Sequence, residues 1–432
     1  GLVMKADNTG TGTGTVAFGT GAAASLSGAG STALIYYNPA SFGTATDFSG
    51  NVTAGTVTAY QLVRTLDQLQ AINDHSMANS YALGRDIDAS ATASWNAGAG
   101  FVPLGTDGAG SVFNPESDWA LAGFTGSFDG QGHTVANLTI NRPSARFAGL
   151  FGFAGRAARI SDLGVVNSSV TGSTYLGGLL GANFGTISRS HFTGSVTGTE
   201  YFTGGLVGIN NPGATITESY ASGSVSSSYS ITGGLVGYDQ GTISKSYSSS
   251  NVTGTDRVGG LVGYAYRSSI MQSHASGIVS GSSKVGGLVG GNERSSISQS
   301  HASGLVSASW AFAGGLVGWN DRSPITQSYA TGNVSAYFQS AGGLVGQSEY
   351  ASITQSYATG KVSSRYHVGG LLGHVSGGLV SQAYATGQVS GEQMVGGLAG
   401  TIYKSASVSQ SYATGNVSSS DFRLGGLVGL SY

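Results

Sequence analysis

Three acidic residues in this 432-residue sequence have a spacing that hydrolytic chemistry or cation binding could use. Asp86 and Asp88 are two residues apart, so on a strand both carboxylates would lie on one face, and Asp129 could complete an acidic groove. Paired carboxylates cleave glycosidic bonds or bind Ca²⁺. The alternative is that each Asp accepts hydrogen bonds from backbone N–H groups at turns, which is its common role. We favour this structural role.

The histidines offer a second, weaker candidate. His274 and His301 occupy the same place in neighbouring copies of a repeat, so they would lie close together. Two imidazoles without a carboxylate make a poor metal site, and filling an aromatic column is the favoured interpretation. The sequence contains no Cys, and no nucleophile elbow, zinc-binding helix or phosphate loop has the required context. We therefore expect no metal, no cofactor and no enzymatic activity.

The third candidate is a set of aromatic and hydroxyl residues that recur in a repeated sequence block of constant length. One copy of this block runs from Ile353 to Ser363. In each block, Ser or Thr follows two residues after Tyr or His. Stacked at strand spacing, these residues would form an aromatic stripe and a column of hydroxyls that can hydrogen-bond along the axis. We favour a stabilising role and keep glycan or surface binding as the alternative. The candidate binding residues are Tyr220, Tyr247, Tyr329, Tyr357, Tyr384, Tyr412, Thr331, Thr359, Thr386 and Thr414.

The elements that must position these residues come from an internal repeat. Its anchor is Gly-Gly-Leu-Val-Gly, and successive anchors lie 26 to 29 residues apart. The length of the repeat varies only in two turns. For example, the spacing from the Val near the end of each block, such as Val362, to the next anchor Leu is 9 or 10 residues. The anchor Leu positions, with Leu150 in a variant copy, are Leu150, Leu179, Leu206, Leu235, Leu261, Leu288, Leu316, Leu344, Leu371, Leu398 and Leu427.

Each block also alternates with period two, which is typical of a strand. Ser328, Ala330, Gly332 and Val334 share one parity and are expected to point inward, whereas the intervening residues from Tyr329 to Ser335 point outward. With 74 Gly in the chain, long helices are disfavoured. The pattern predicts an all-β fold, a parallel β-solenoid with about 27 residues and about three short strands per coil.

The N-terminal third departs from the repeat. We expect irregular Gly/Thr-rich β-coils over residues 1–60, atypical coils with projecting or capping loops over 61–147, and regular repeats over 148–432. Leu66, Leu69 and Ile72 are three residues apart and predict one short amphipathic helix. Asp129-Gly130 followed by alternating apolar residues predicts a turn and a strand.

Together, the passage around Asp129-Gly130, the Tyr81–Ser90 stretch and the anchors resemble the GLUG-repeat region of large secreted bacterial exoproteins of the filamentous-haemagglutinin type. The resemblance covers roughly residues 60 to 432. It implies a right-handed β-helix outside a Gram-negative-type cell, exported by two-partner secretion through an outer-membrane partner, and often adhesive. Only Asn38-Pro39 echoes that family's Asn-Pro-rich secretion signature, so we expect an interior piece of a longer protein.

Composition limits the partners. With 18 Lys+Arg against 20 Asp+Glu, the net charge of −2 gives no electrostatic basis for binding nucleic acid. We expect an extracellular stalk of a surface or secreted adhesin that contacts glycans or proteins of host or neighbouring cells. End-to-end or lateral self-association is a further possibility, since open coil ends expose strand edges. The alternatives are a carbohydrate-active β-helix enzyme using the three Asp, a self-assembling filament subunit, and an ice or crystal binder using the Thr column.

Overall fold

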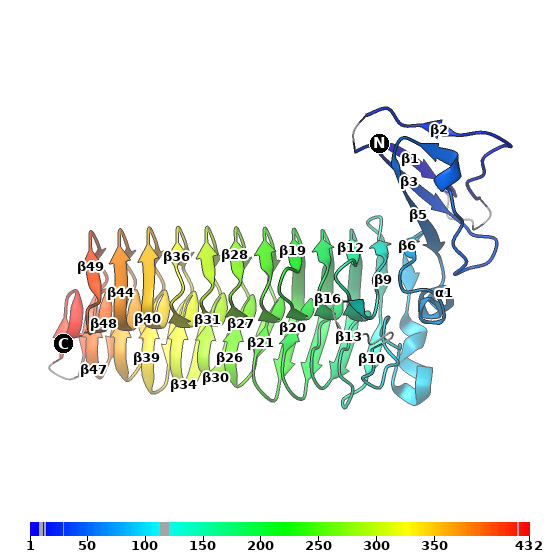
Figure 1. Cartoon of the computed structure of the whole chain (residues 1–432). Coiled ribbons are helices and arrows are strands. Elements are labelled where there is room, and N and C mark those ends of the chain that lie inside the picture. The colour runs from blue at the N-terminus through cyan, green and yellow to red at the C-terminus, as the bar shows by residue number, and fades with distance from the viewer. Residues whose placement is uncertain (8–11, 13, 29, 113–120, 421–422) are drawn as a thin grey trace.

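The computed structural model is an all-β parallel solenoid of about 15 turns, with about 27 residues per turn and one short α-helix. It describes residues 1–7, 12, 14–28, 30–112, 121–420 and 423–432. Figure 1 shows a straight rod formed by the repeats, with the N-terminal strands set at an angle to its end. Two parallel sheets, of 24 and 27 strands, run along the rod. The predicted fold class is confirmed.

The first sheet contains the strands that follow each anchor Leu and the strands centred on the block's Ile or Val. The anchor strands are β11 (Phe151–Ala154), β14 (Leu180–Asn183), β18 (Val207–Asn210), β22 (Val236–Asp239), β27 (Val262–Tyr266), β31 (Val289–Glu293), β35 (Val317–Asp321), β40 (Val345–Thr354), β44 (Leu372–Ser381), β48 (Ala399–Tyr403) and β53 (Val428–Ser431). The Ile strands are β12 (Arg159–Ser161), β15 (Thr186–Ser188), β19 (Thr215–Thr217), β23 (Thr242–Ser244), β28 (Ser269–Met271), β32 (Ser296–Ser298), β36 (Ile325–Thr326) and β49 (Ser407–Ser409), and β40 and β44 extend through this position.

The second sheet contains the strands that begin at the aromatic residue and those that lead into the next anchor. They are β13 (Gly164–Gly172), β16 (His191–Gly198), β17 (Thr203–Gly204), β20 (Tyr220–Ser227), β21 (Thr232–Gly233), β24 (Tyr247–Ser248), β25 (Asn251–Thr253), β26 (Asp256–Gly259), β29 (His274–Ala275), β30 (Val279–Gly286), β33 (His301–Ala302), β34 (Val306–Gly314), β37 (Tyr329–Ala330), β38 (Val334–Ala336), β39 (Gln339–Gly342), β41 (Tyr357–Ala358), β42 (Val362–Ser363), β43 (Tyr366–Gly369), β45 (Tyr384–Ala385), β46 (Val389–Gly391), β47 (Gln393–Gly396), β50 (Tyr412–Ala413), β51 (Val417–Ser419) and β52 (Leu424–Gly425).

A coil therefore contains more strands than the three expected from the sequence: the coil from β22 to β26 has five. The reason is the corners. Lys245, between β23 and β24, has φ 49°, and Arg189, between β15 and β16, has φ 45°. A left-handed residue turns the chain sharply and ends the strand, yet nothing about Lys or Arg indicates this conformation in a sequence.

Identical positions pair across successive coils. Ile216 pairs with Ile243, and Ile243 pairs with Ile270. The anchor Leu from Leu150 to Leu398 are fully buried in one continuous core. The inward and outward assignment is confirmed: Ser328, Ala330, Gly332 and Val334 are buried, and the alternate residues are not.

The anchor glycines let neighbouring coils approach closely. A Cβ built on Gly287 would lie 2.0 Å from the carbonyl oxygen of Gly315 in the next coil. Gly287 has no left-handed φ, so the requirement for glycine at this position is steric. This contact explains why the anchor's second residue is Gly in successive coils.

The N-terminal strands extend the first sheet. They are β1 (Leu2–Lys5), β3 (Thr32–Tyr37), β5 (Thr56–Val63), β6 (Ser80–Leu83) and β8 (Ser127–Asp129), and all of their pairings are parallel. The second sheet begins with β7 (Ile87–Asp88), β9 (Thr134–Ala136) and β10 (Thr139–Asn141), and β2 (Ala24–Ser25) pairs with β4 (Val52–Thr53) in a separate small sheet. The predicted turn and strand after Asp129 are thus present between β8 and β9.

The predicted helix is α1 (Leu66–Ala71), continued by a 3₁₀ turn at Ile72–Asp74. Thr65 caps it by accepting a hydrogen bond from the Gln68 N–H. Leu69, Ile72, Phe101 and Leu104 are buried against the first coils of the core. The helix and the described part of the following loop, which contains a 3₁₀ segment at Ser90–Gly98, therefore cap the core; residues 113–120 of that loop lie outside the described residues. A further 3₁₀ turn spans Ser49–Asn51.

No helix in the described part of the chain has the length and apolar character needed to cross a bilayer.

Candidate functional site

The aromatic residues at the start of the block form a continuous stack. Each ring lies nearly parallel to its neighbour, with interplanar angles of 1° to 6° and centroid distances of 4.6 to 5.2 Å. We call these nine residues the aromatic column: His191, Tyr220, Tyr247, His274, His301, Tyr329, Tyr357, Tyr384 and Tyr412.

The geometry of the aromatic column limits how it can bind a ligand. Its members are half-buried, apart from Tyr412 in the last coil, which is 53% exposed. Because neighbouring rings cover both faces of each ring between the two ends of the column, a ligand there meets ring edges and hydroxyl groups rather than open faces. Burial also raises the pKa of Tyr247 and Tyr357 above the ordinary phenol value, so both phenols stay hydrogen-bond donors even in mildly alkaline solution.

The hydroxyl column lies beside the aromatic column on the same face. It contains Thr193, Ser222, Ser249, Ser276, Ser303, Thr331, Thr359, Thr386 and Thr414. From Ser249 to Thr414 its members are exposed. We expected hydrogen bonds along the axis between these hydroxyls, and no such bond joins the members of this column, all of which belong to the described residues. These hydroxyls therefore face solvent, and other residues form the axial hydroxyl hydrogen bonds.

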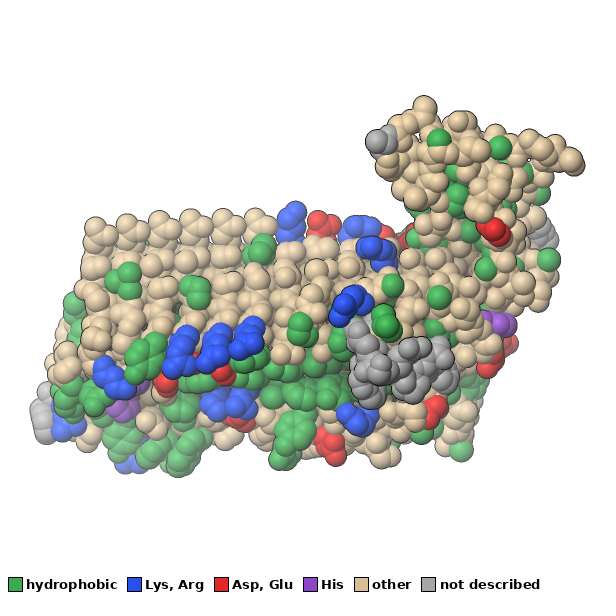
Figure 2. Space-filling model, in the orientation of Figure 1, with side chains coloured by type: hydrophobic (Ala, Val, Ile, Leu, Met, Phe, Trp, Pro, Cys, Tyr) green, Lys and Arg blue, Asp and Glu red, His purple; other side chains and the backbone are tan. Residues whose placement is uncertain are grey.

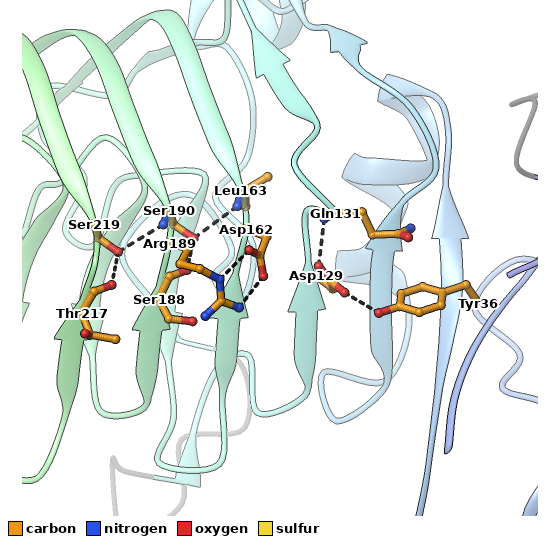
Figure 3. Close-up of polar contacts among 10 residues, drawn as sticks. All are labelled: Tyr36, Asp129, Gln131, Asp162, Leu163, Ser188, Arg189, Ser190, Thr217 and Ser219. Carbon is orange, nitrogen blue, oxygen red and sulfur yellow. Dashed lines mark hydrogen bonds and ion pairs between the residues drawn. The ribbon is translucent and has the colours of Figure 1, made fainter. Parts of the chain in front are cut away.

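The axial hydroxyl ladder is formed by buried serines that directly precede the aromatic column. In Figure 3, the Ser190 N–H donates to Ser219 Oγ at 3.1 Å, and Ser219 Oγ donates to the Thr217 carbonyl at 2.8 Å. The same pair of bonds recurs along the rod. We call this set the serine ladder: Ser190, Ser219, Ser246, Ser273, Ser300, Ser328 and Ser356.

The corner before the serine ladder carries a left-handed residue in each coil, with φ between 45° and 54°. The residues are Asp162, Arg189, Glu218, Lys245, Gln272, Gln299, Gln327, Gln355, Gln382 and Gln410. Figure 3 shows Arg189 held against Asp162 by two hydrogen bonds of 2.7 Å, and this contact holds the pKa of Asp162 below its usual range. Figure 2 shows charges along the upper edge toward the N-terminal end and uncharged side chains beyond them. The ion pair adds a contact between two neighbouring coils at this corner, and the corner keeps the same conformation where its residue is Gln.

The three aspartates of the hydrolase alternative have separate partners. Asp86 accepts from the Thr134 N–H at 2.8 Å and lies 3.4 Å from His133 Nδ1. Asp88 accepts from the Ser90 N–H and from Asn137 Nδ2, both at 3.0 Å. The hydrogen bond from Thr134 lowers the pKa of Asp86, and that from Asn137 lowers the pKa of Asp88.

Asp129 lies on the other sheet. Its carboxylate accepts from the Gln131 N–H at 2.8 Å and from the Tyr36 hydroxyl at 2.6 Å, as Figure 3 shows. Burial raises the pKa of Tyr36, and Asp129 adds to the effect. Since β7 and β8 belong to different sheets, the structure does not bring Asp129 together with Asp86 and Asp88. All three carboxylates accept hydrogen bonds from backbone N–H groups, which is the structural role that we favoured.

His274 and His301 stack face to face inside the aromatic column, with ring centroids 4.9 Å apart. Burial lowers the pKa of both residues, and His301 is lowered further by His274. Two parallel rings in this arrangement point their nitrogens in the same direction instead of converging on one ion. Within the described ranges there is no group of three or more His, Asp or Glu side chains that could hold a metal.

Sequence reasoning missed a set of exposed aromatics on the turn that leads into the anchor. Tyr201, Tyr229, Trp310 and Tyr337 are 40%, 49%, 54% and 72% exposed. All four lie in coils in which the spacing from the block's Val to the next anchor Leu is 10 residues. This is the longer of the two spacings. That length variation was visible in the sequence and is the feature that could have identified them.

Comparison with known proteins agrees with the repeat. The family model described as the GLUG motif matches residues 172–197, 254–280, 339–363 and 364–390. The chain is also similar to Halomucin of Haloquadratum walsbyi, with 41% identity over 165 residues. That match covers 37% of this chain and 2% of Halomucin, so the chain spans a small fraction of that protein's length. No solved structure matches the chain. These findings support a β-helical protein built from GLUG repeats, and the filamentous-haemagglutinin type stays a prediction.

Proposed function

We propose that this chain is a rigid extracellular stalk of a surface or secreted adhesin, which supports attachment or cell-cell contact. The observation that carries the proposal is the unbroken core. One hydrophobic cluster contains anchor leucines from Leu150 to Leu398, and partly buried Val428 packs against it in the last coil. Each repeat packs on both of its neighbours, so bending the rod at any coil would disturb packed core contacts.

The backbone adds stiffness along the axis. Anchor N–H groups donate to the next coil at every step, for example from Leu288 to the Leu316 carbonyl at 2.9 Å. The eleven anchors give ten steps, and at about 4.8 Å per step the repeats extend over about 48 Å. A stalk of this kind holds whatever it carries at a fixed distance from its attachment point.

The surface supports a role in contact. The aromatic column presents ring edges and phenol groups, and the exposed hydroxyl column presents Thr and Ser side chains that can hydrogen-bond to partner surfaces. We propose host or neighbouring-cell glycans or proteins as partners. Two-partner secretion through an outer-membrane protein and a Gram-negative-type origin are part of the same proposal and rest on the resemblance. Self-association is kept as the alternative that imaging distinguishes.

Two experiments test the stalk. Negative-stain images of the purified chain at several concentrations should show single straight rods, and end-to-end filaments would instead favour a self-assembling subunit. Deleting this region from the full-length parent should reduce attachment to target cells. Normal attachment by the deletion variant would refute the adhesive role.

A further inference from the structure

One of the exposed aromatics on the turn that leads into the anchor, Tyr337, lines an open groove. The groove has a volume of about 340 Å³, and its lining includes Tyr337, Ser363, Ser364, Arg365, Ser390 and Glu392. It lies on the turn that leads into the anchor, away from the aromatic and hydroxyl columns. Figure 2 shows hydrophobic side chains gathered with Lys or Arg along the lower margin of the rod, over β34 and β39.

The groove results from a difference in length between neighbouring coils. Gly281 pairs with Ala308 and Ser283 with Ala311, so Ser282 faces two residues, Ser309 and Trp310, in a β-bulge. The next coil keeps the extra residue, since Ala308 pairs with Ala336 and Ala311 with Gln339. Bulges redirect side chains, and these two coils turn their aromatic residues outward.

The following coil is shorter again. Ser335 pairs with Ser363 and Gln339 with Tyr366, so three residues of the longer coil stand beside only Ser364 and Arg365. The groove lies where the longer coil is next to the shorter one. Tyr337 forms one wall, and the serines of the shorter coils line the other side.

Aromatic residues form a ridge next to the groove. Trp310 and Phe338 stack with centroids 4.9 Å apart and an angle of 16°, and Phe338 meets the ring of Tyr366 edge-on at 5.3 Å. Tyr337 is 72% exposed, far more than the Tyr residues in the middle of the aromatic column. Neighbouring exposed rings form a contiguous apolar patch, and such patches often mark ligand-binding surfaces.

The polar groups at the groove are arranged in fixed positions. Arg365 Nε donates to Glu392 Oε2 at 2.6 Å, and both side chains remain about half exposed, at 44% and 49%. The Arg365 guanidinium also lies 5.5 Å from the centre of the Tyr366 ring. Ser364 is buried at the groove, and its hydroxyl has no hydrogen-bond partner among the described residues. The pair adds no net charge, while its remaining N–H and carboxylate groups can bond to hydroxyls.

We propose that this groove binds a neutral oligosaccharide, with a sugar ring against Tyr337 and its hydroxyls bonded to Arg365 and Glu392. Sugar C–H groups carry partial positive charge and pack favourably on the negative face of an aromatic ring. The groove is at the small end of ligand sites, which suits one or two sugar units and excludes a folded domain. The balanced charge disfavours anionic sugars, which would meet Glu392.

A second aromatic pair extends the site along the rod. Tyr201 and Tyr229 meet edge-on with centroids 4.6 Å apart, and they also occupy two adjacent long coils. Three coil steps separate Tyr229 from Trp310, a distance of about 14 Å at strand spacing. Tyr229 and Trp310 both stand four residues after their block Val, on the turn that leads into the anchor, so an extended glycan chain that follows this turn can contact both.

The proposal names a ligand class within the proposed adhesive function and rests on it, and binding by the purified chain tests the groove separately. The probes are gluco-, manno- and N-acetylglucosamine hexasaccharides, with oligogalacturonate as the acidic counterpart, measured by isothermal titration calorimetry. We expect a neutral hexasaccharide to bind and oligogalacturonate not to bind. Tyr337→Ala and Arg365→Ala should each weaken binding about tenfold, from the loss of one aromatic or charged contact.

Two control variants locate the site. Tyr350→Ala removes a ring that is 49% exposed on the first sheet, and Tyr403→Phe removes one hydroxyl from a Tyr that is 43% exposed on the same sheet. Both should bind as the parent does, and circular dichroism should show that all four variants are folded. Binding of none of the neutral probes, preference for oligogalacturonate, or a loss of binding confined to Tyr350→Ala or Tyr403→Phe would each overturn the proposal.

The outcomes also separate the groove from the stalk. If no probe binds while deletion of the region still abolishes attachment, the groove proposal fails and the stalk stands. If a neutral probe binds through Tyr337 while the deletion leaves attachment normal, the groove stands and the adhesive role fails.

Discussion

A single methyl group placed between two coils should destabilise the rod strongly. In Gly287→Ala, the added Cβ would lie 2.0 Å from the Gly315 carbonyl oxygen and 3.0 Å from the Ala302 Cβ. An ordinary carbon–oxygen contact is about 3.3 Å, so the coils would have to separate by about 1.3 Å. Gly287 donates from its N–H to the Gly314 carbonyl at 3.0 Å, and this bond would weaken as the coils separate.

The expected cost is about 3 kcal/mol. Overpacking of a tight interior costs about 1–3 kcal/mol, and weakening an inter-coil hydrogen bond adds about 1 kcal/mol. Gly426→Ala is the matched control, because Gly426 holds the same anchor position in the last coil and a Cβ there meets nothing within 4 Å. Its effect should stay within about 0.5 kcal/mol.

Urea unfolding followed by far-UV circular dichroism measures both variants. We expect Gly287→Ala to unfold at a clearly lower urea concentration than the parent, and Gly426→Ala to coincide with the parent. In Gly287→Ala, amide hydrogen exchange should become faster than in the parent mainly in the coils next to residue 287. If the two variants were equally stable, the close approach of successive anchors would be wrong.

Three further changes test the buried polar groups. Ala383→Ser should give the Ser356 N–H the hydroxyl acceptor that equivalent residues have, and raise the free energy of unfolding by about 0.5–1.5 kcal/mol in urea titrations; no gain would contradict the serine ladder. Burial raises the pKa of Asp239 from 3.8 to about 6, so its stabilising contribution is lost as pH rises through that range. Asp239→Asn should therefore stabilise the chain by about 3 kcal/mol at pH 7 and hardly at all at pH 4, and a pH-independent effect would refute this reasoning. Burial lowers the pKa of His274 and His301 below 6.5, so stability should fall as pH drops below 6.5; the double variant His274→Tyr/His301→Tyr should flatten that fall in urea midpoints at pH 7 and pH 5, and an unchanged slope would count against it.

Much of the fold follows from local patterns. The alternation around Tyr329 predicted which side chains point inward, because the period of a strand is two and one face must be buried. The spacing of Leu66, Leu69 and Ile72 predicted α1, which the structure confirms. The corners were not predictable, since a left-handed Gln327 depends on its stacked neighbours and not on its own conformational preference.

The candidate sites show where sequence reasoning stops. Ser328 was interpreted only as a small inward residue, and its hydrogen bonds to neighbouring coils depend on register. Asp129 cannot be placed relative to Asp86 from the sequence, because they belong to different sheets. The groove beside Tyr337 depends on a difference in length between two coils, which becomes a shape only when the coils are stacked.

The central claim is that equivalent residues lie above one another along a straight rod, and distances between spin labels test it most directly. The chain has no Cys, so paired substitutions at exposed corner positions can be labelled without background. Gln272→Cys/Gln382→Cys spans four coil steps and Gln272→Cys/Gln410→Cys spans five, which predicts backbone separations of about 19 Å and about 24 Å. Narrow distance distributions that differ by one coil spacing would agree with the stacked rod. Equal, reversed or broad distributions would contradict it.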